Sequence, residues 1–435
     1  MLLTALCAFV CANALFGFLV LGGIYTVIFA PCLIILICSL VSPFTGRRLP
    51  VRRHQQIKNG VTLLTAFLIA GVLSCGVIIG MTVQDFGLTL ILLNAGLAAA
   101  VLAAVFWDGI IRIYISSVQL GIKWRVIGAV CGMIPIVNLI VLIKLIRLSE
   151  REYRFETEKV QLNASRSEER ICATRYPLLL VHGVFFRDFE RINYWGRIPA
   201  ELEKNGAVIY YGRQSSALSV ADSAAELNET IERIVSETGC GKVNIIAHSK
   251  GGLDSRFAIS RLGCDRYTAS LTTVNTPHRG CKFADYLLSK AGEGLRARVS
   301  AAYNAAAKKL GDPAPDFISA VTDLTFEACG RINEECPDMP GVLYQSIGSR
   351  CVKAGSGKFP LNLTYLIAGH FEGDNDGLVS VESMKWGESF TEYKPAGSRG
   401  ISHGDMIDLN RENIDGFDVR ELYVQLVSAL KERGL

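Results

Sequence analysis

The chain has 435 residues, half of them hydrophobic, and a formal net charge of +4 at neutral pH. Residues 1–147 carry ten basic and two acidic side chains, whereas residues 148–435 carry 35 basic and 39 acidic ones. The positive charge therefore belongs to the apolar N-terminal part. No basic stripe marks the polar part, and this excludes a typical nucleic-acid-binding protein.

The first apolar segment, residues 2–41, is interrupted only by Gly22-Gly23. It is too long for a single membrane span of about 20 residues, so it predicts two closely spaced helices. It has no charged start and is too long for a signal peptide. Later apolar segments predict a third, a fourth and a fifth span, the last interrupted by Pro135. These segments are residues 60–81, 87–107 and 126–146.

Residues 1–147 are therefore predicted to be an all-α transmembrane domain of four to five spans. The basic loop GRRLPVRRHQQIK, residues 46–58, predicts a cytoplasmic loop. Five spans would then place the downstream domain outside the cytoplasm. The basic residues after the last apolar segment favour the cytoplasm instead, and a re-entrant hairpin at Pro135 would keep the domain there. The side of the membrane stays open at this point.

Residues 148–172 are charged and predict either a linker or a solvated extension of the last helix. From residue 173 onward, short apolar runs alternate with segments of helical periodicity. This alternation predicts an α/β domain with a mostly parallel sheet, over residues 173–435. The predicted strands are residues 178–183, 207–211, 243–247, 270–274 and the later run LYQSIG.

The segment Ala247-His248-Ser249-Lys250-Gly251 stands between a predicted strand and a predicted helix. A serine flanked by small residues on such a turn is typical of an exposed nucleophile. The alternative is that Ser249 only caps the helix. A nucleophilic serine needs a base and an orienting carboxylate, and in this fold the order along the chain is serine, acid, histidine.

That order selects His403 as the base, and it leaves Asp374 and Asp376 as candidate acids. Asp376 lies in an Asn-Asp-Gly turn, which suits an orienting acid on a loop after a strand. His370 precedes the acid, so it is interpreted as a structural hydrogen bonder. The developing oxyanion needs two backbone donors, for which the amides after the nucleophile and after the first strand are the candidates. These are the amides of Lys250 and Val184.

Together these stretches resemble the family I bacterial triacylglycerol lipases of the α/β-hydrolase fold. The resemblance rests on YPLLLVHG, KVNIIAHSKGGLDSR, LTTVNTPHRG, NDGLVS and ISHGDMIDL, spread over residues 176–410. It implies Ser249 as nucleophile, Asp376 as acid and His403 as base, with an oxyanion hole from the amides of Val184 and Lys250. The N-terminal membrane domain lies outside the resemblance.

Two features depart from the family pattern. Ala247 stands where the family usually has glycine. Many members bind a structural calcium through two aspartates, and Asp405, two residues after His403, occupies the place of one. No match for the other lies upstream of Asp376, so no cofactor is required by this interpretation, and calcium stays open.

Residues 285–340 form an insertion that predicts a helical cap. Phe317, Ile318, Val321 and Leu324 recur on one face. They predict a cap helix packed on the domain or a mobile lid whose apolar face meets lipid.

The predicted function is a serine hydrolase, integral to a bacterial cell membrane, that cleaves carboxylic esters of lipids through an acyl-enzyme on Ser249. A triacylglycerol lipase or a related esterase fits best. A phospholipase or an acyltransferase would use the same triad, and a non-catalytic membrane protein with an inert hydrolase-like domain is the alternative. The expected partners are a lipid ester and the bilayer, without nucleic acid, and the oligomeric state is not predicted. Thirteen irregularly spaced cysteines without a CxxC pair predict free thiols rather than a disulfide framework or a zinc site.

Overall fold

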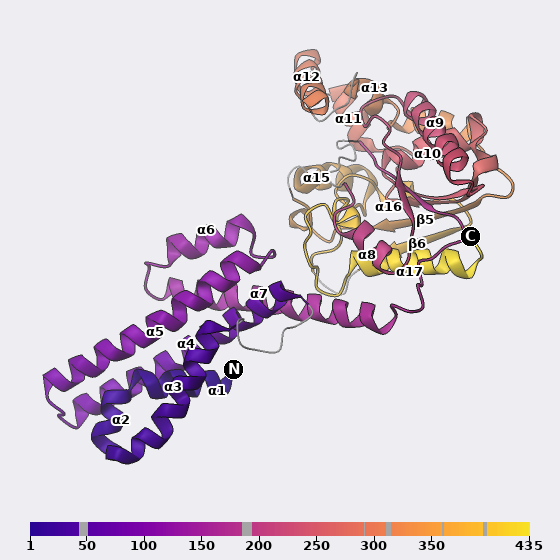
Figure 1. Ribbon diagram of the computed structural model, residues 1–435. Helices are drawn as coiled ribbons and strands as arrows, with labels where there is room; N and C mark the ends of the chain where they lie inside the picture. Colours follow the sequence, from indigo (N-terminus) through magenta and orange to yellow (C-terminus); the bar gives the residue numbers. More distant parts are fainter. Residues whose placement is uncertain (43–50, 185–193, 291, 310–314, 359–360, 395–397) are drawn as a thin grey trace. The chain divides into compact units, whose positions relative to one another are not determined.

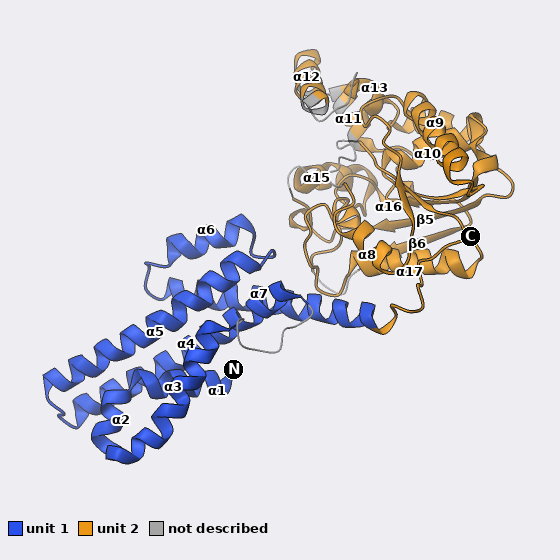
Figure 2. Cartoon of the chain, in the orientation of Figure 1, with its two compact units in different colours: residues 1–164 blue, residues 165–435 orange. Residues whose placement is uncertain are grey.

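The computed structural model describes residues 1–42, 51–184, 194–290, 292–309, 315–358, 361–394 and 398–435. The chain divides into two compact units, Met1–Ala164 and Ser165–Leu435 (Figure 2). Residues 46–50 of the basic loop, and residues 291 and 310–314 of the expected cap, lie outside the described ranges.

Unit 1 is entirely helical over its described residues. Three helical segments are long and apolar enough to cross a membrane, Ala14–Val41, Arg52–Val83 and Leu88–Ser116. The helices are α1 (Leu2–Ala12), α2 (Ala14–Leu21), the 3-10 turn η1 (Gly22–Ile24), α3 (Tyr25–Val41), α4 (Arg52–Val83), α5 (Leu88–Ser116), α6 (Gly121–Cys131) and α7 (Val137–Ser165).

The first of these apolar segments folds back on itself at Gly22 and Gly23, as the sequence suggested. The rings of Phe18 and Phe29 lie 5.5 Å apart, whereas eleven residues of straight helix would separate them by about 16 Å. The Tyr25 hydroxyl donates a hydrogen bond to the carbonyl of Val10. Helix α3 therefore packs back along α1 and α2. At the other end of unit 1, α7 runs without a break to Ser165, so most of the charged segment after residue 147 is helix.

Unit 2 is built around a six-stranded parallel sheet with strand order β2-β1-β3-β4-β5-β6. Figure 1 labels its last two strands, β5 and β6. The strands are β1 (Leu178–Val181), β2 (Ile209–Tyr211), β3 (Val243–His248), β4 (Thr268–Val274), β5 (Leu343–Ser349) and β6 (Ser389–Tyr393). The structure thus contains every strand expected from the sequence, and β6 is an addition. The predicted α/β domain with a mostly parallel sheet is confirmed.

The helices of unit 2 cover both faces of the sheet. Alternate residues of β1 point to opposite faces, so Leu178 and Leu180 pack with α8 and α17, while Leu179 and Val181 pack with α9 and α10. Both faces are buried, which explains why these strands are continuous apolar runs. These helices are α8 (Ile198–Lys204), α9 (Val220–Thr238), α10 (Lys250–Arg261) and α17 (Val419–Glu432).

The insertion after β4 is helical, as expected for a cap. Its helices are α11 (Lys282–Lys290), α12 (Glu293–Lys309), α13 (Phe317–Thr322) and α14 (Phe326–Glu335). The apolar face of α13 is packed: Phe317 and Val321 are buried in a cluster with α11, and Leu378 packs against that cluster. In this conformation α13 is a packed cap helix, in agreement with the first of its two interpretations. The remaining short helices are α15 (Leu361–Glu372) and α16 (Val381–Met384).

Candidate active site

Ser249 stands at the sharp turn between β3 and α10. Its φ of 56° and ψ of −131° lie outside the regions that non-glycine residues ordinarily adopt. Its amide donates to the carbonyl of Val274, which fixes the turn to the neighbouring strand β4. Strain of this kind persists only where the surroundings enforce it, and it is typical of a nucleophile presented on a strand-to-helix turn.

Two glycines allow the chain to pack around this serine. A Cβ on Gly183 would lie 2.7 Å from the Cβ of Ser249, and a Cβ on Gly251 would lie 2.4 Å from the carbonyl oxygen of His182. Neither position leaves room for a side chain. Ala247, which departs from the family pattern, is fully buried in β3, and its methyl group is accommodated. The loop after β1 therefore packs directly on the turn that carries Ser249.

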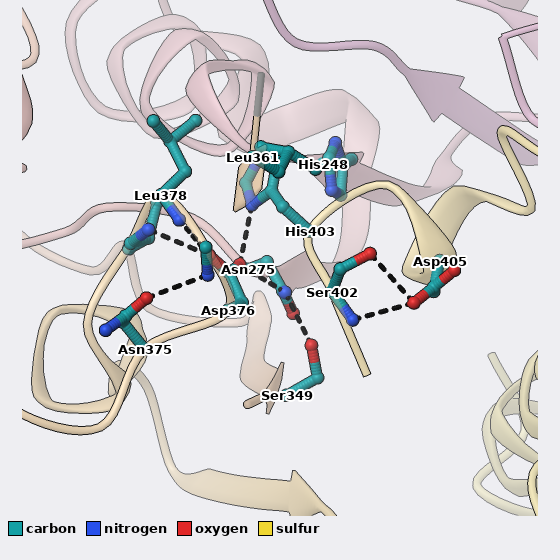
Figure 3. Close-up of polar contacts among 12 residues, drawn as sticks. His248, Asn275, Ser349, Leu361, Asn375, Asp376, Leu378, Ser402, His403 and Asp405 are labelled. Atoms are coloured by element: carbon teal, nitrogen blue, oxygen red, sulfur yellow. Dashed lines mark hydrogen bonds and ion pairs between the residues drawn. The ribbon is translucent and has the colours of Figure 1, made fainter. Parts of the chain in front are cut away.

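His403 and Asp376 are brought together from two different loops. The Nδ1 atom of His403 lies 2.6 Å from Oδ2 of Asp376, and the amide of His403 donates to the carbonyl of Asp376 at 2.8 Å. Asp376 is fully buried and His403 is 8% exposed. Figure 3 shows the carboxylate aimed at the imidazole ring. This contact fixes the ring orientation and makes Nε2 the atom that is free to take a proton.

The Asp376 carboxylate is held by four donors. Oδ1 accepts from the amides of Leu378 and Val379 at 2.9 and 2.8 Å. Oδ2 accepts from Nδ2 of Asn275 at 2.6 Å, in addition to the contact with His403 (Figure 3). Burying a carboxylate is costly unless hydrogen-bond donors replace the water that it loses, and these donors do so here. Leu378 also packs on the cap cluster, so the cap contacts the loop that carries the acid.

Asn275 has a site role that the sequence analysis missed. It follows β4 with a φ of 47°, and its Nδ2 bridges Asp376 and the hydroxyl of Ser349 at the end of β5. The signal was its position in NTPHRG, because polar residues that follow neighbouring parallel strands meet at one edge of the sheet.

His403 approaches Ser249 alongside the ring of His248. The two imidazole rings have centroids 4.5 Å apart, and Ser249 follows His248 directly. Among the described residues, no hydrogen bond joins the Ser249 hydroxyl to His403. Such contacts often tighten only when substrate is bound.

The His248 ring is held as a structural neighbour rather than a second base. Its Nδ1 lies 2.7 Å from the hydroxyl of Tyr194, which also accepts a hydrogen bond from the amide of Gly183. Burial, reinforced by the nearby His403, lowers the pKa of His248 well below its ordinary value, so it is neutral at physiological pH. Tyr194 thus links the loop after β1 to the turn at Ser249. The sequence analysis missed this tyrosine, because nothing in its local pattern marks it.

The two expected oxyanion donors are the backbone amides of Lys250 and Val184. Lys250 is the first residue of α10, so its amide has no carbonyl partner within the helix, and the positive end of the helix dipole surrounds it. Val184 is buried and follows Gly183, beside Ser249. Residues 185–193, the rest of that loop, lie outside the described ranges.

The side chain of Lys250 turns away from this edge and is 1% exposed. Its Nζ lies 2.7 Å from Oδ1 of Asp254 and 2.9 Å from the hydroxyl of Ser223. Burial raises the pKa of Asp254 to about 7, and the charge of Lys250 offsets this only in part. The ion pair lies within α10, and the bond from Lys250 to Ser223 ties α10 to α9.

Asp405 does not offer a calcium site. Oδ2 accepts from the amide and the hydroxyl of Ser402, both at 2.8 Å (Figure 3). Oδ1 accepts from the guanidinium of Arg399 at 3.1 Å. The carboxylate of Asp405 is therefore already paired with the positively charged side chain of Arg399. Within the described ranges, no group of three or more histidine, cysteine, aspartate or glutamate side chains could hold a metal ion. Among the described residues, the surroundings of Asp405 therefore do not fit calcium.

The other candidates from the sequence lie apart from this geometry. Asp374 is exposed and forms an ion pair with Arg350. His370 is exposed near the end of α15. His278 is buried, and its ring stacks on Trp386 at 5.2 Å. The parallel sheet and the residues gathered at the carboxyl ends of its strands define the chain as an α/β hydrolase.

The relatives of the chain narrow this class further. A triacylglycerol lipase of Burkholderia plantarii is 35% identical over 148 residues, which are 32% of this chain and 41% of that protein. Triacylglycerol lipase 2 of Saccharomyces cerevisiae is 32% identical over 264 residues, which are 56% of this chain and 74% of the yeast protein. The chain therefore belongs to the triacylglycerol lipase family, and the resemblance seen in its motifs is confirmed.

The extent of these matches differs between relatives. The chain spans only about two fifths of the length of the Burkholderia relative. No family model matches the chain. Among solved structures, Staphylococcus hyicus lipase is 17% identical, covers 60% of this chain and 97% of its own, and has a TM-score of 0.47.

Proposed function

We propose that the protein is a membrane-anchored serine hydrolase that cleaves carboxylic esters of lipids, with triacylglycerols as the substrate class that its family favours. The observation that carries the proposal is the 2.6 Å contact between His403 and Asp376 beside the strained turn of Ser249. Helices long and apolar enough to cross a membrane support the anchorage.

In the proposed reaction, His403 Nε2 takes the proton of the Ser249 hydroxyl as its oxygen attacks the ester carbonyl. Asp376 holds the ring and stabilises the imidazolium that forms. The amides of Val184 and Lys250 receive the oxyanion. His403 then gives its proton to the leaving alcohol, and the acyl group stays on Ser249. Water, activated by the same histidine, hydrolyses the acyl-enzyme and restores the serine.

The test is hydrolysis of p-nitrophenyl esters from acetate to palmitate in detergent, with wild type beside Ser249→Ala. The proposal expects activity that depends on Ser249 and rises with chain length. Activity confined to short esters would replace the lipase by an esterase with a narrow cleft. Labelling by a fluorophosphonate probe provides a second readout, because it needs an activated serine but no particular substrate. Folded wild type that neither hydrolyses any ester nor takes the label would refute a serine hydrolase.

A further inference from the structure

Helix α6 and the first half of α7 have an apolar surface that nothing in the described part of unit 1 covers. We propose that residues 121–143 form a helical hairpin that enters one leaflet of the membrane and returns to the same side. The chain from Ser165 onward then lies on the cytoplasmic side. This inference rests on the proposed membrane anchorage but not on the chemistry at Ser249.

Helix α6 contacts both α5 and α7. A Cβ on Gly128 would lie 2.2 Å from the Tyr114 hydroxyl of α5 and 3.0 Å from the Leu145 side chain of α7, so Gly128 sits closely between them. The ammonium group of Lys144 lies 5.8 Å from the centre of the Trp124 ring. Between the helices, Ile136 adopts a φ of 68°, and the chain reverses there.

The hairpin is too short to cross a bilayer. Eleven residues of α6 measure about 16 Å, and a hydrocarbon core measures about 30 Å. Leu145 of α7 lies at the same height as Tyr114, near the end of α5. From Leu145 back to Val137, the first residue of α7, the helix extends about 12 Å. The turn therefore reaches roughly the middle of the hydrocarbon, if α5 spans it.

Lipid tails are the occupant that suits this surface. At the turn, Met133 is 91% exposed and Ile136 is 73% exposed, side chains that water would not favour. The apolar residues continue along both helices, while the charged ones stand near the base of the hairpin. The exposed apolar residues are Ile122, Val126, Val130, Met133, Ile134, Ile136, Val137, Leu139, Ile140 and Ile143. The basic residues toward the base are Lys123, Arg125, Lys144 and Arg147.

Hydrogen bonds fix the base of the hairpin to the start of α4. Glu152 of α7 is buried, and it accepts from the hydroxyl of Ser117 and the amide of Val118 at the entry to the hairpin. The same carboxylate pairs with Arg53 at 3.0 Å. Arg112, near the end of α5, donates to Gln56 at 2.8 Å. The entry of the hairpin, its exit and the start of α4 therefore lie at one end of unit 1.

Every lysine and arginine among the described residues of the apolar part lies at this end or on the hairpin. Residues 1–46 and 59–111 contain no lysine or arginine, and the opposite end, at residues 84–87 between α4 and α5, carries only Asp85. An excess of lysine and arginine marks the cytoplasmic side of a membrane protein. Helix α4 then crosses the membrane away from the cytoplasm, and α5 crosses back. The hairpin adds no further crossing. The free thiols of all thirteen cysteines agree with a reducing compartment.

The test is cysteine labelling of the full-length protein in spheroplasts with a membrane-impermeant maleimide. Three single substitutions report on three positions relative to the membrane. They are Asp85→Cys on the turn between α4 and α5, Met133→Cys at the hairpin turn, and Glu168→Cys after α7. The unmodified chain, with its native cysteines, supplies the background signal. We expect Asp85→Cys to react in intact spheroplasts, Glu168→Cys only after permeabilisation, and Met133→Cys only after the membrane is dissolved in detergent.

Each other pattern overturns a defined part of the inference. Labelling of Glu168→Cys in intact spheroplasts would mean that the chain crosses the membrane an odd number of times between the start of α4 and residue 168. Labelling of Met133→Cys in intact spheroplasts would mean that the hairpin spans the bilayer, and labelling on permeabilisation alone would place the turn in water. Release of the wild-type protein from membranes by alkaline carbonate would instead refute the anchorage itself. Ester hydrolysis in detergent is measured separately, so failure of the chemistry at Ser249 stays distinguishable.

Discussion

Replacement of Gly183 by alanine tests whether the loop after β1 supplies an oxyanion donor. The new Cβ would lie 2.7 Å from the Cβ of Ser249, 3.0 Å from the carbonyl of His248 and 3.1 Å from the Tyr194 hydroxyl. Carbon atoms in contact normally stay about 3.5–4.0 Å apart, so one side must move by about 1 Å. The Ser249 turn is tied to β4 through its amide, so we expect the loop to move instead.

The expected effect on catalysis is large because donor geometry is strict. A donor acts within about 2.7–3.1 Å of the oxyanion, and removal of one such donor costs about 10²–10³-fold in kcat. A shift of about 1 Å in the Val184 amide should have an effect of that order. Extra volume in a packed site typically costs about 1–3 kcal/mol of stability, which should lower Tm without abolishing the fold.

The assay is kcat and KM for p-nitrophenyl butyrate, beside thermal unfolding followed by circular dichroism. Gly330→Ala is the matched control, because Gly330 lies within α14 and nothing stands within 4 Å of its added Cβ. That substitution should keep full activity and raise stability by up to about 1 kcal/mol. Full activity of folded Gly183→Ala would refute the assignment of a donor to this loop.

Three further substitutions or treatments probe the rest of the site. Asp376→Asn should keep the fold and lower kcat by about 10⁴-fold, as expected when a triad loses the acid that sets the histidine tautomer; a loss below tenfold would mean that another acid orients His403. Because burial raises the pKa of Asp254 to about 7, its contribution to stability is present at low pH and is lost as the pH rises from about 4 through 7. The stability advantage of wild type over Asp254→Asn, from urea unfolding, should therefore shrink between pH 5 and pH 8, and an advantage independent of pH would contradict the raised pKa. Because Arg399 occupies the Asp405 carboxylate, EDTA should leave ester hydrolysis unchanged, whereas inactivation that calcium reverses would show a metal site.

The sequence predicted the elements of unit 2 whose physical signal is local. Leu178–Val181 and Val243–His248 are buried on both faces, so they appear as continuous apolar runs. Ser249 was recognisable because a strained turn between a strand and a helix restricts its neighbours to small residues. Strand β6 lies at the edge of the sheet and is only partly buried. Its residues are polar and apolar in mixture, so they gave no comparable signal.

The contacts that complete the site come from residues far apart in the chain. Asn275 reaches Asp376 across 101 positions, and Tyr194 reaches His248 across 54. Composition and spacing carry no record of such pairs, because only the register of the sheet brings them together. The same limit applied to Pro135: an apolar segment of spanning length cannot reveal that its two halves fold against each other. The contact of Gly128 with Leu145 supplies that information.

The position of Lys250 beside the nucleophile raises the question of whether it, rather than His403, could be the base. An ammonium group has three donors and no acceptor. Here Nζ has three oxygen partners, on Asp254, Ser223 and Ser219, and all three lie beneath the turn, on α10 or at the start of α9. The group is therefore held away from the reacting hydroxyl, with no position from which to take its proton. In the proposed mechanism the lysine therefore serves the site through its backbone amide, and the proton transfer stays with His403.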